Sequence, residues 1–313
     1  IASLVGSEMC IRDSLIPMNN YRILFMGTSP FAVPTLRRLS ETSHELLNVY
    51  TSPPKKANRG MKISMSPVSI CAKELNIDVH TPSTLKSSEE INKIKELNLD
   101  LIIVVSYGFI LPSEILTLPQ YGCYNLHASL LPKWRGAAPI QRSMIEGDKI
   151  TGVTVMKMDI GLDTGDIASQ KEVLIKDKNY EELETELAEE GSKLIVQFLD
   201  ESIKNPELHS QNNDKATYAT KVTKEETKIN WNEESEKIVR RINAYSPKPG
   251  AWFMLNGKRV KITKDQVGKY SDQPGKIIDD QFNISCGHQS IRPLEIQIEG
   301  KKSSSIEEFL RGN

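Results

Sequence analysis

The sequence has few of the residues that disulfide frameworks and structural metal sites require. Only four cysteines occur in 313 residues, and none belongs to a CxxC pair. Cys10, Cys71, Cys123 and Cys286 are widely spaced, which argues against a zinc site or a disulfide framework and is typical of a reducing compartment. We therefore expect no metal and a cytoplasmic location.

Long apolar runs are missing as well. No run approaches the ~20 residues that a helix needs to cross a membrane, so we expect no membrane partner. The segment before Tyr21 lacks a charged start followed by an apolar core, so it is not a convincing signal peptide. We interpret residues 1–18 as a non-native or disordered leader, with Met18 as the natural start.

Charge of one sign is also scarce, because 40 Lys and Arg stand against 41 Asp and Glu, a net charge of −1. Residues 216–313 carry 17 Lys and Arg against 13 Asp and Glu, a net of +4. A mildly basic C-terminal part is a weak indication of nucleic-acid contact. Charge alone favours chance variation, so this indication needs support from motifs.

Short apolar runs alternate with amphipathic segments through the first two thirds of the chain. Helix starts are indicated at Ser29-Pro30 and Ser66-Pro67, because Ser is a good N-cap and Pro is favoured at the first helical position. Strands are predicted at residues 21–26, 46–51, 101–106, 121–126 and 152–158, and further helices at 87–97 and 179–200. This alternation predicts an α/β fold, a Rossmann-like doubly wound and mostly parallel sheet with helices on both faces.

The pattern changes after a polar segment at residues 205–214. A short helix at 233–244 precedes short alternating runs at 251–255, 259–262, 275–278 and 290–298, with a strong hairpin turn at Asn256-Gly257. These runs predict a small β-barrel. We therefore divide the chain into a catalytic domain (19–207), a linker (208–224) and a C-terminal β domain (225–313).

Asn125 and His127 are the first candidates for chemistry. They lie two residues apart at the end of a predicted strand, so they face the same side of the sheet. Ligands of doubly wound sheets bind at the carboxyl ends of the strands. An amide donor beside an imidazole suits a carbonyl oxygen that becomes an oxyanion. A lone His at a strand end is more often only hydrogen-bonded, so the pair needs a partner.

Asp163 is the candidate partner, in the GLDTGD turn that follows the strand at 152–158. Flanking glycines allow a tight turn that points the carboxylate back at the site. A carboxylate, an imidazole and an amide together can support acyl transfer. An aspartic protease is excluded because it needs two such carboxylates in an all-β setting. The loop after the first strand lacks the GxGxxG glycines of a nicotinamide enzyme.

The sequence around these residues resembles one family closely. Asn125-x-His127 followed by SLLPKWRGAAPIQ, and then GLDTGD, is similar to the formyltransferases that use 10-formyltetrahydrofolate. The similarity runs from Tyr21 to the C-terminus and includes GTSPF, SPPKKANRGMKISMSPV, YGFILP and PKPGAWF. The SLLPKWRGAAPIQ run is highly specific.

The resemblance implies site residues and a co-substrate. The catalytic trio would be Asn125, His127 and Asp163, and 10-formyltetrahydrofolate would be bound without a metal. Folate contacts would come from Ser129, Leu130, Leu131 and Pro132, and from the main chain near Val104 and Tyr107. A basic loop would contact the acceptor end of a tRNA through Arg59, Lys62 and Lys56, and the C-terminal module would be an OB-like tRNA-binding domain.

The loop departs from the family pattern after Gly60, where further Arg or Lys is more usual, and this leaves the roles of the neighbours of Arg59 open. The resemblance implies transfer of the formyl group to the amino group of methionyl initiator tRNA, in translation initiation. Because nothing in the sequence suggests a dedicated interface, we expect a monomer. One alternative is the same chemistry on a small amine, a sugar nucleotide or purine precursor, against which the basic loop and β module argue. Another is a non-catalytic RNA-binding relative, against which the intact trio argues.

Overall fold

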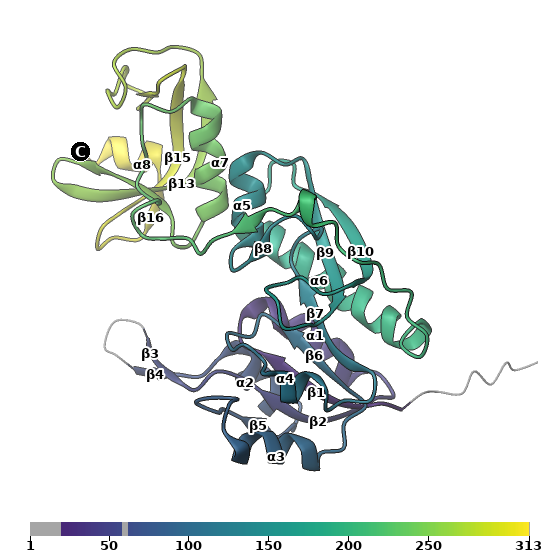
Figure 1. Cartoon of the computed structure of the whole chain (residues 1–313). Helices are drawn as coiled ribbons and strands as arrows, with labels where there is room; N and C mark the ends of the chain where they lie inside the picture. Colours follow the sequence, from purple (N-terminus) through teal and green to yellow (C-terminus); the bar gives the residue numbers. More distant parts are fainter. Residues whose placement is uncertain (1–19, 58–61, 313) are drawn as a thin grey trace, which may run out of the picture.

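A seven-stranded sheet forms the centre of the N-terminal part of the chain (Figure 1). The computed structural model describes residues 20–57 and 62–312. In spatial order the strands are β10 (Ile167–Leu174), β9 (Ile150–Lys157), β7 (Gly122–His127), β6 (Leu101–Val105), β1 (Arg22–Gly27), β2 (Glu45–Tyr50) and β5 (Val79–His80). The five strands from β7 to β5 run parallel, so the expected mostly parallel sheet is confirmed.

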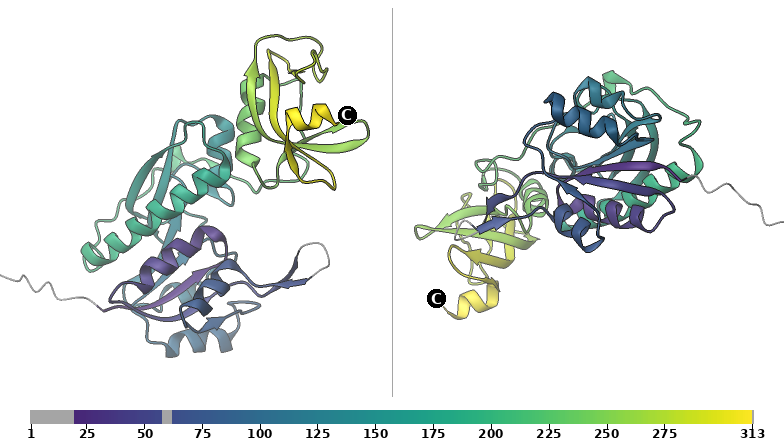
Figure 2. Two further views of the ribbon diagram at one scale, coloured as in Figure 1. Left: turned by 180° about the vertical axis from the view of Figure 1, so that it is seen from behind. Right: turned by 90° about the horizontal axis from the view of Figure 1, so that it is seen from below.

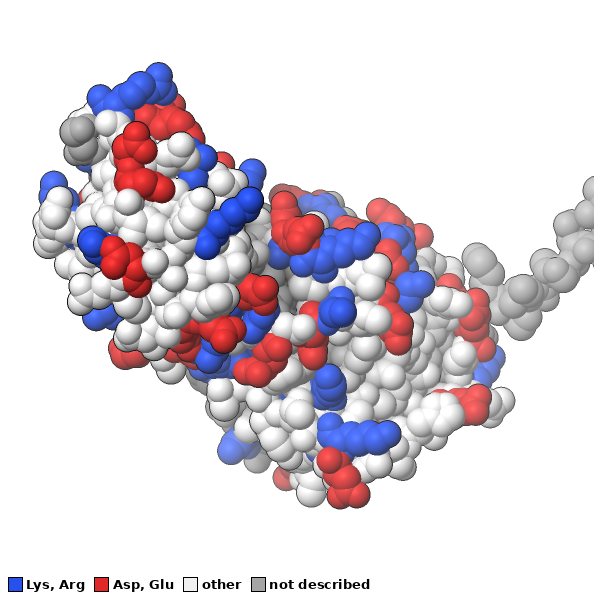
Figure 3. Space-filling model, turned by 90° about the horizontal axis from the view of Figure 1, so that it is seen from above, with Lys and Arg blue, Asp and Glu red and all other residues white. Residues whose placement is uncertain are grey.

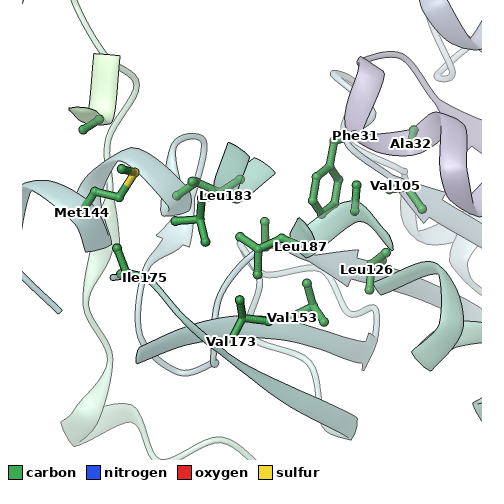
Figure 4. Packing of buried hydrophobic residues seen from close by; sticks show 14 of the residues in the cluster. Phe31, Ala32, Val105, Leu126, Met144, Val153, Val173, Ile175, Leu183 and Leu187 are labelled. Carbon is green, nitrogen blue, oxygen red and sulfur yellow. The ribbon is translucent and has the colours of Figure 1, made fainter. Parts of the chain in front are cut away.

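Helices cover both faces of this sheet, as the alternating pattern predicted. On one face lie α1 (Val33–Ser40), α2 (Pro67–Glu74) and α6 (Tyr180–Glu201); on the other lie α3 (Ser88–Glu96) and α4 (Ser113–Leu116). Every residue of β6 is buried, as a strand between two helical layers requires. On the α6 side, Leu183 and Leu187 pack with Val153 and Leu126 (Figure 4).

Most helix starts follow their capping signals. The hydroxyl oxygen of Ser66 accepts a hydrogen bond from Ser69 N, and Asn179 forms a full capping box with Glu182. Ser29 differs, because its side chain makes no cap and instead donates to Ser106 Oγ at 2.8 Å. The helix after it accordingly starts as a 3₁₀ turn, η1 (Pro30–Ala32), before α1 begins.

The direction of β9 changes how the candidate residues meet. β9 runs antiparallel to β7, with His127 opposite Thr154 and Asn125 opposite Met156. From the sequence, Asp163 was expected to follow the carboxyl end of a parallel strand. The end of β9 lies beside the start of β7 instead. The segment from Met158 to Asp166 must fold back over the sheet, and β10, which was not predicted, returns antiparallel to β9.

The C-terminal part is a β domain with one long helix. α7 (Ser235–Tyr245) packs on β13 (Lys258–Gly268), which pairs with β12 (Ala251–Leu255) and β15 (Ser290–Ile298). β15 also pairs with β14 (Ile284–Ser285) and β16 (Ser303–Ser305), and α8 (Ile306–Arg311) follows. No ladder joins β12 to β14 or β16 within the described residues, so the antiparallel sheet is a partly open barrel of the OB-like kind.

One local prediction for this domain, the hairpin turn, is confirmed, and another, a strand, is wrong. Asn256 and Gly257 both have positive φ, at 47° and 75°, as a two-residue hairpin turn between β12 and β13 requires. The strand predicted at 275–278 is wrong, because only Ile277 pairs there, in an isolated bridge to Ile284. Main-chain bonds from Gly275 and Ile278 to the segment 283–285 hold it as an irregular loop instead.

Two connections link the two parts of the molecule. The segment after α6 makes an isolated bridge from His209 to Ile167, forms η2 (Asn213–Lys215), and pairs as β11 (Tyr218–Ala219) with β8 (Arg135–Gly136). α5 (Pro139–Glu146) packs against α7. The views of Figure 2 agree that the β domain sits at one end of the N-terminal part, beside α5. The segment predicted as a linker, 208–224, therefore contains a 3₁₀ turn and a short strand.

The predicted basic loop forms a two-stranded ribbon, which was not foreseen. β3 (Lys55–Ala57) pairs antiparallel with β4 (Lys62–Ser64). The ribbon projects from the N-terminal part on the same side as the β domain (Figures 1 and 2). Arg59 lies outside the described residues, between the two strands.

Residues 20–57 and 62–312 contain no helix long and apolar enough to cross a membrane. The same residues contain no group of three or more His, Cys, Asp or Glu side chains arranged to hold a metal ion. Cys71, Cys123 and Cys286 are free and buried, and Cys10 lies outside the described residues.

Candidate active site

A cavity of about 560 Å³ lies over the ends of β6 and β7. Its walls come from the segment 104–111, from β7, from the start of α5 and from the segment 158–163. Asn125, His127 and Asp163 all line it, so the structure brings the three catalytic candidates to one space. A volume of this size is in the range of small-molecule sites.

Asn125 and His127 face this cavity because they alternate with residues that face the helices. Leu126 between them packs in the core beside Gly191 of α6. The His127 side chain is buried, and its Nε2 lies 2.9 Å from the main-chain oxygen of Trp134. A carbonyl can only accept, so Nε2 carries a proton and the donor tautomer is fixed. Nδ1 is then the nitrogen that faces Asp163.

Asp163 approaches the imidazole from the folded-back segment. Its Oδ2 accepts a hydrogen bond from Gly136 N at 2.8 Å and lies 3.7 Å from His127 Nδ1. The second distance is longer than a hydrogen bond, so the carboxylate lies beside the imidazole without bonding to it directly. The carboxylate is 15% exposed, where its charge acts more strongly than in water.

This arrangement can hold an acyl group and accept a proton. Asn125 supplies an amide donor for a developing oxyanion, and Asp163 supplies a fixed acceptor beside an imidazole. A second cavity of about 420 Å³ lies between α5 and α7, lined among others by Lys149, Lys176 and Arg240. It contains none of the catalytic candidates.

The two sets of predicted folate contacts are placed differently. Val104 and Tyr107 line the cavity together with Met156, Met158 and other apolar side chains. Ser129, Leu130, Leu131 and Pro132 are not among its lining residues. The Ser129 hydroxyl donates to Lys133 O at 2.6 Å, and Leu131 N donates to Thr154 Oγ1 at 3.2 Å. These bonds hold the loop that supplies the carbonyl of Trp134, and folate contact by this loop stays a prediction.

Of the predicted tRNA contacts, Lys56 and Lys62 belong to the β3–β4 ribbon. Lys56 pairs with Ile63 and Lys62 with Ala57 through their main chains. Arg59 falls outside the described residues. The contact of these three basic residues with tRNA therefore stays a prediction.

Two residues that the sequence analysis missed also line the cavity. Tyr180 and Glu184 stand one turn apart at the start of α6, and the Tyr180 hydroxyl donates to Glu184 Oε1 at 2.6 Å. Burial raises the pKa of the Glu184 carboxyl. Their spacing of four residues was readable, but α6 was interpreted only through its apolar positions, so the polar pair gave no distinct signal.

Comparisons with known proteins match the whole described fold. The family profile described as "Formyl transferase" matches residues 21–199, and "Formyl transferase, C-terminal domain" matches residues 221–313. A methionyl-tRNA formyltransferase from Pelagibacter ubique is 45% identical over 93% of this chain and 96% of its own length. A relative with the same name from Afipia carboxidovorans is also 45% identical, with the same coverage.

Solved structures agree on the fold. HypX from Aquifex aeolicus in complex with tetrahydrofolic acid matches 93% of this chain and 47% of its own, with a TM-score of 0.64 and 17% identity. A methionyl-tRNA formyltransferase from Clostridium thermocellum matches 79% of this chain and 93% of its own, with a TM-score of 0.54 and 20% identity. With both profiles matched in order and relatives at 45% identity, this chain belongs to the formyl transferase family.

Proposed function

We propose that this protein transfers a formyl group from 10-formyltetrahydrofolate to the free amino group of methionyl initiator tRNA. The observation that carries the proposal is the cavity in which Asn125, His127 and Asp163 meet, in a chain that is 45% identical to methionyl-tRNA formyltransferases over nearly its whole length. We also propose that the catalytic domain ends at residue 207 and that the C-terminal domain begins after residue 224.

The cavity suits a folate donor. Apolar side chains of Val104, Met156 and Met158 line it, and so does the segment 106–111, whose main chain carries polar groups. A flat ring with polar edges requires this combination. The bound donor supplies the formyl carbon. Val104 and Tyr107 would hold its ring, and the related HypX structure contains tetrahydrofolic acid.

Each catalytic side chain has a separate task in this proposal. Asn125 donates to the formyl oxygen as the oxyanion develops, an interaction typically worth roughly 3–4 kcal/mol. Trp134 O fixes the His127 ring, which directs Nδ1 towards Asp163. Asp163, held by Gly136 N, accepts the proton that the attacking amine loses, directly or through His127. As the bond between the formyl carbon and N10 of the folate breaks, this proton passes to N10 and tetrahydrofolate leaves.

The tRNA would bind across the two parts of the molecule. The β3–β4 ribbon projects on the side of the β domain (Figure 2), so its basic residues and the β domain could contact one acceptor stem. On the face in Figure 3, Lys and Arg are interspersed with Asp and Glu. Binding would therefore rely more on individual phosphate contacts than on one basic surface. Such contacts position a nucleic acid without reading its sequence.

Formylation assays test the proposal. We expect the purified chain to formylate methionyl initiator tRNA with 10-formyltetrahydrofolate, and to leave sugar nucleotides and purine precursors unmodified. His127→Ala should lower kcat by about 10²–10⁴ while circular dichroism and thermal unfolding stay near the parent values. Activity on a small amine but not on the tRNA would contradict the proposed acceptor, and near-full activity of His127→Ala would contradict the mechanism.

A further inference from the structure

The Asp163 turn is held from outside the catalytic domain's own loops. Gln211, in the segment that leads to the β domain, donates from Nε2 to Asp163 O at 2.9 Å and to Gly165 O at 2.7 Å. One amide group thus binds two carbonyls within the GLDTGD turn. Both protons of this amide are used, so the contact fixes the orientation of the side chain as well as the turn.

The other end of the same amide is held by a buried arginine. Gln211 Oε1 accepts from Arg135 Nε at 3.0 Å and from Nη2 at 2.8 Å. Arg135 is only 2% exposed, and its Nη2 also donates to Asn213 Oδ1 at 2.9 Å. A buried guanidinium needs acceptors for its protons, so Arg135 and Gln211 require each other.

Arg135 lies in the loop that supplies partners to both His127 and Asp163. The preceding residue, Trp134, gives its carbonyl to His127, and the following residue, Gly136, gives its N–H to Asp163. The segment after Gln211 fixes this loop further, because Thr217 binds Trp134 N and Arg135 N. Gln211 therefore connects the loop that holds the imidazole with the turn that holds the carboxylate.

From these contacts we propose that Gln211 is a positioning residue for the reaction, acting through Arg135 and through the backbone of Asp163. The proposal rests on the proposed formyl transfer. Asp163 has φ of 53°, a left-handed conformation that is uncommon for residues other than glycine and that surrounding contacts must stabilise. The two bonds from Gln211 supply that constraint. Without them the turn relaxes and the carboxylate leaves the imidazole.

A substitution can separate the two halves of the Gln211 contact. Gln211→Glu keeps acceptor oxygens for Arg135 but replaces the donors to Asp163 O and Gly165 O with an oxygen that repels them. A misplacement of about 1 Å at a reacting group costs about 10²-fold. We therefore expect kcat to fall ten- to a hundredfold, with KM for 10-formyltetrahydrofolate changed less than threefold. Gln281→Glu, on an exposed side chain, is the matched control with parent activity.

Gln211→Met, which keeps the length and loses both contacts, is measured alongside. The proposal predicts that both variants fold, bind tetrahydrofolate like the parent and lose kcat. Parent-like kcat in folded Gln211→Glu would overturn it. If both variants fail to fold, Gln211 is structural, and the positioning role is equally overturned. An inactive parent protein on methionyl initiator tRNA would instead contradict the proposed function.

Discussion

At the scale of single residues, left-handed backbone gathers at the candidate site. Ser106, Trp134 and Asp163 have φ of 48°, 63° and 53°, and none is glycine. Each is followed or flanked by residues that contact the cavity or the catalytic side chains. Such conformations cost about 1–3 kcal/mol each and persist where surrounding contacts impose them. Here they direct a carbonyl towards His127 and a carboxylate towards its ring.

The sequence could predict only part of this site. Asn125 and His127 share a face because side chains alternate along a strand, a rule that needs no tertiary information. Asp163 reaches them only because the segment after antiparallel β9 folds back. Its position depends on Gln211, which lies 48 positions further along the chain. No local pattern encodes a contact of that range.

The role of the Asp163 charge can be tested without disturbing the turn. Asp163→Asn retains an oxygen that can accept from Gly136 N, so the backbone should stay in place, but the amide cannot take the proton of the amine. We expect kcat to fall by about 10²–10⁴, with KM for the folate nearly unchanged. Steady-state formylation kinetics measure this. A variant with parent kcat would show that the proton goes elsewhere.

At the scale of elements, capped helices were the most predictable parts. Ser66 and Asn179 mark the starts of α2 and α6 because their side chains bind the free N–H groups of the first turn. β10 and the pairing of β8 with β11 were missed. Their sequences are polar or very short, and their order comes from partners elsewhere in the chain. Elements stabilised by distant partners carry little signal of their own.

β13 contains an unusual carboxyl beside a bulge. The ladder with β15 shifts register on both sides of Lys264, next to Asp265. Both Asp265 oxygens are buried without a hydrogen-bond partner among the described residues. Burial raises the pKa of Asp265 to about 7. The same burial, with Asp265 nearby, raises the pKa of Cys286 to about 12.

Asp265 should therefore make stability depend on pH. Well below pH 3.8 the carboxyl is protonated in both the folded and unfolded states. As the pH rises towards 7 only the unfolded state ionises, so the folded state loses stability, and above pH 7 the loss is complete. As the pH rises from 4 to 8, the free energy of unfolding of Asp265→Asn should increase relative to that of the parent by on the order of 2–4 kcal/mol. Denaturant unfolding at both pH values checks this, and a pH-independent difference would contradict it.

At the scale of the whole molecule, the two parts share contacts and a continuous core. Ile238, Ile242 and Tyr245 of α7 belong to the same buried cluster as Met144 of α5 and the α6 leucines. Arg240 Nε of α7 donates to Ile145 O at 3.1 Å. The relative placement of the candidate site and the β domain thus depends on packing around α5 and α7.

Arg142 and Glu226 make the most direct charged link between α5 and the segment entering the β domain. Their two hydrogen bonds measure 2.8 Å and 3.1 Å, and Arg142 Nε also donates to Thr220 O at 3.0 Å. Burial raises the pKa of Glu226, but the bonds from Arg142 and Thr223 N outweigh it and hold the pKa below its usual value. Paired, partly buried groups of this kind stabilise a fold more than surface pairs.

Glu226→Gln should therefore destabilise the junction in a pH-dependent way. Because the folded pKa is lowered, the stabilisation is fully present above about pH 4.5 and is lost as the pH falls through the folded value. We expect a loss of about 1.5–3 kcal/mol at pH 7, which shrinks as the pH falls below 4.5. The exposed Arg37–Glu74 pair offers the control, because solvent screens it and Glu74→Gln should cost less than Glu226→Gln at pH 7. Equal losses for the two variants in denaturant unfolding at pH 7 would mean that the junction does not depend on this pair.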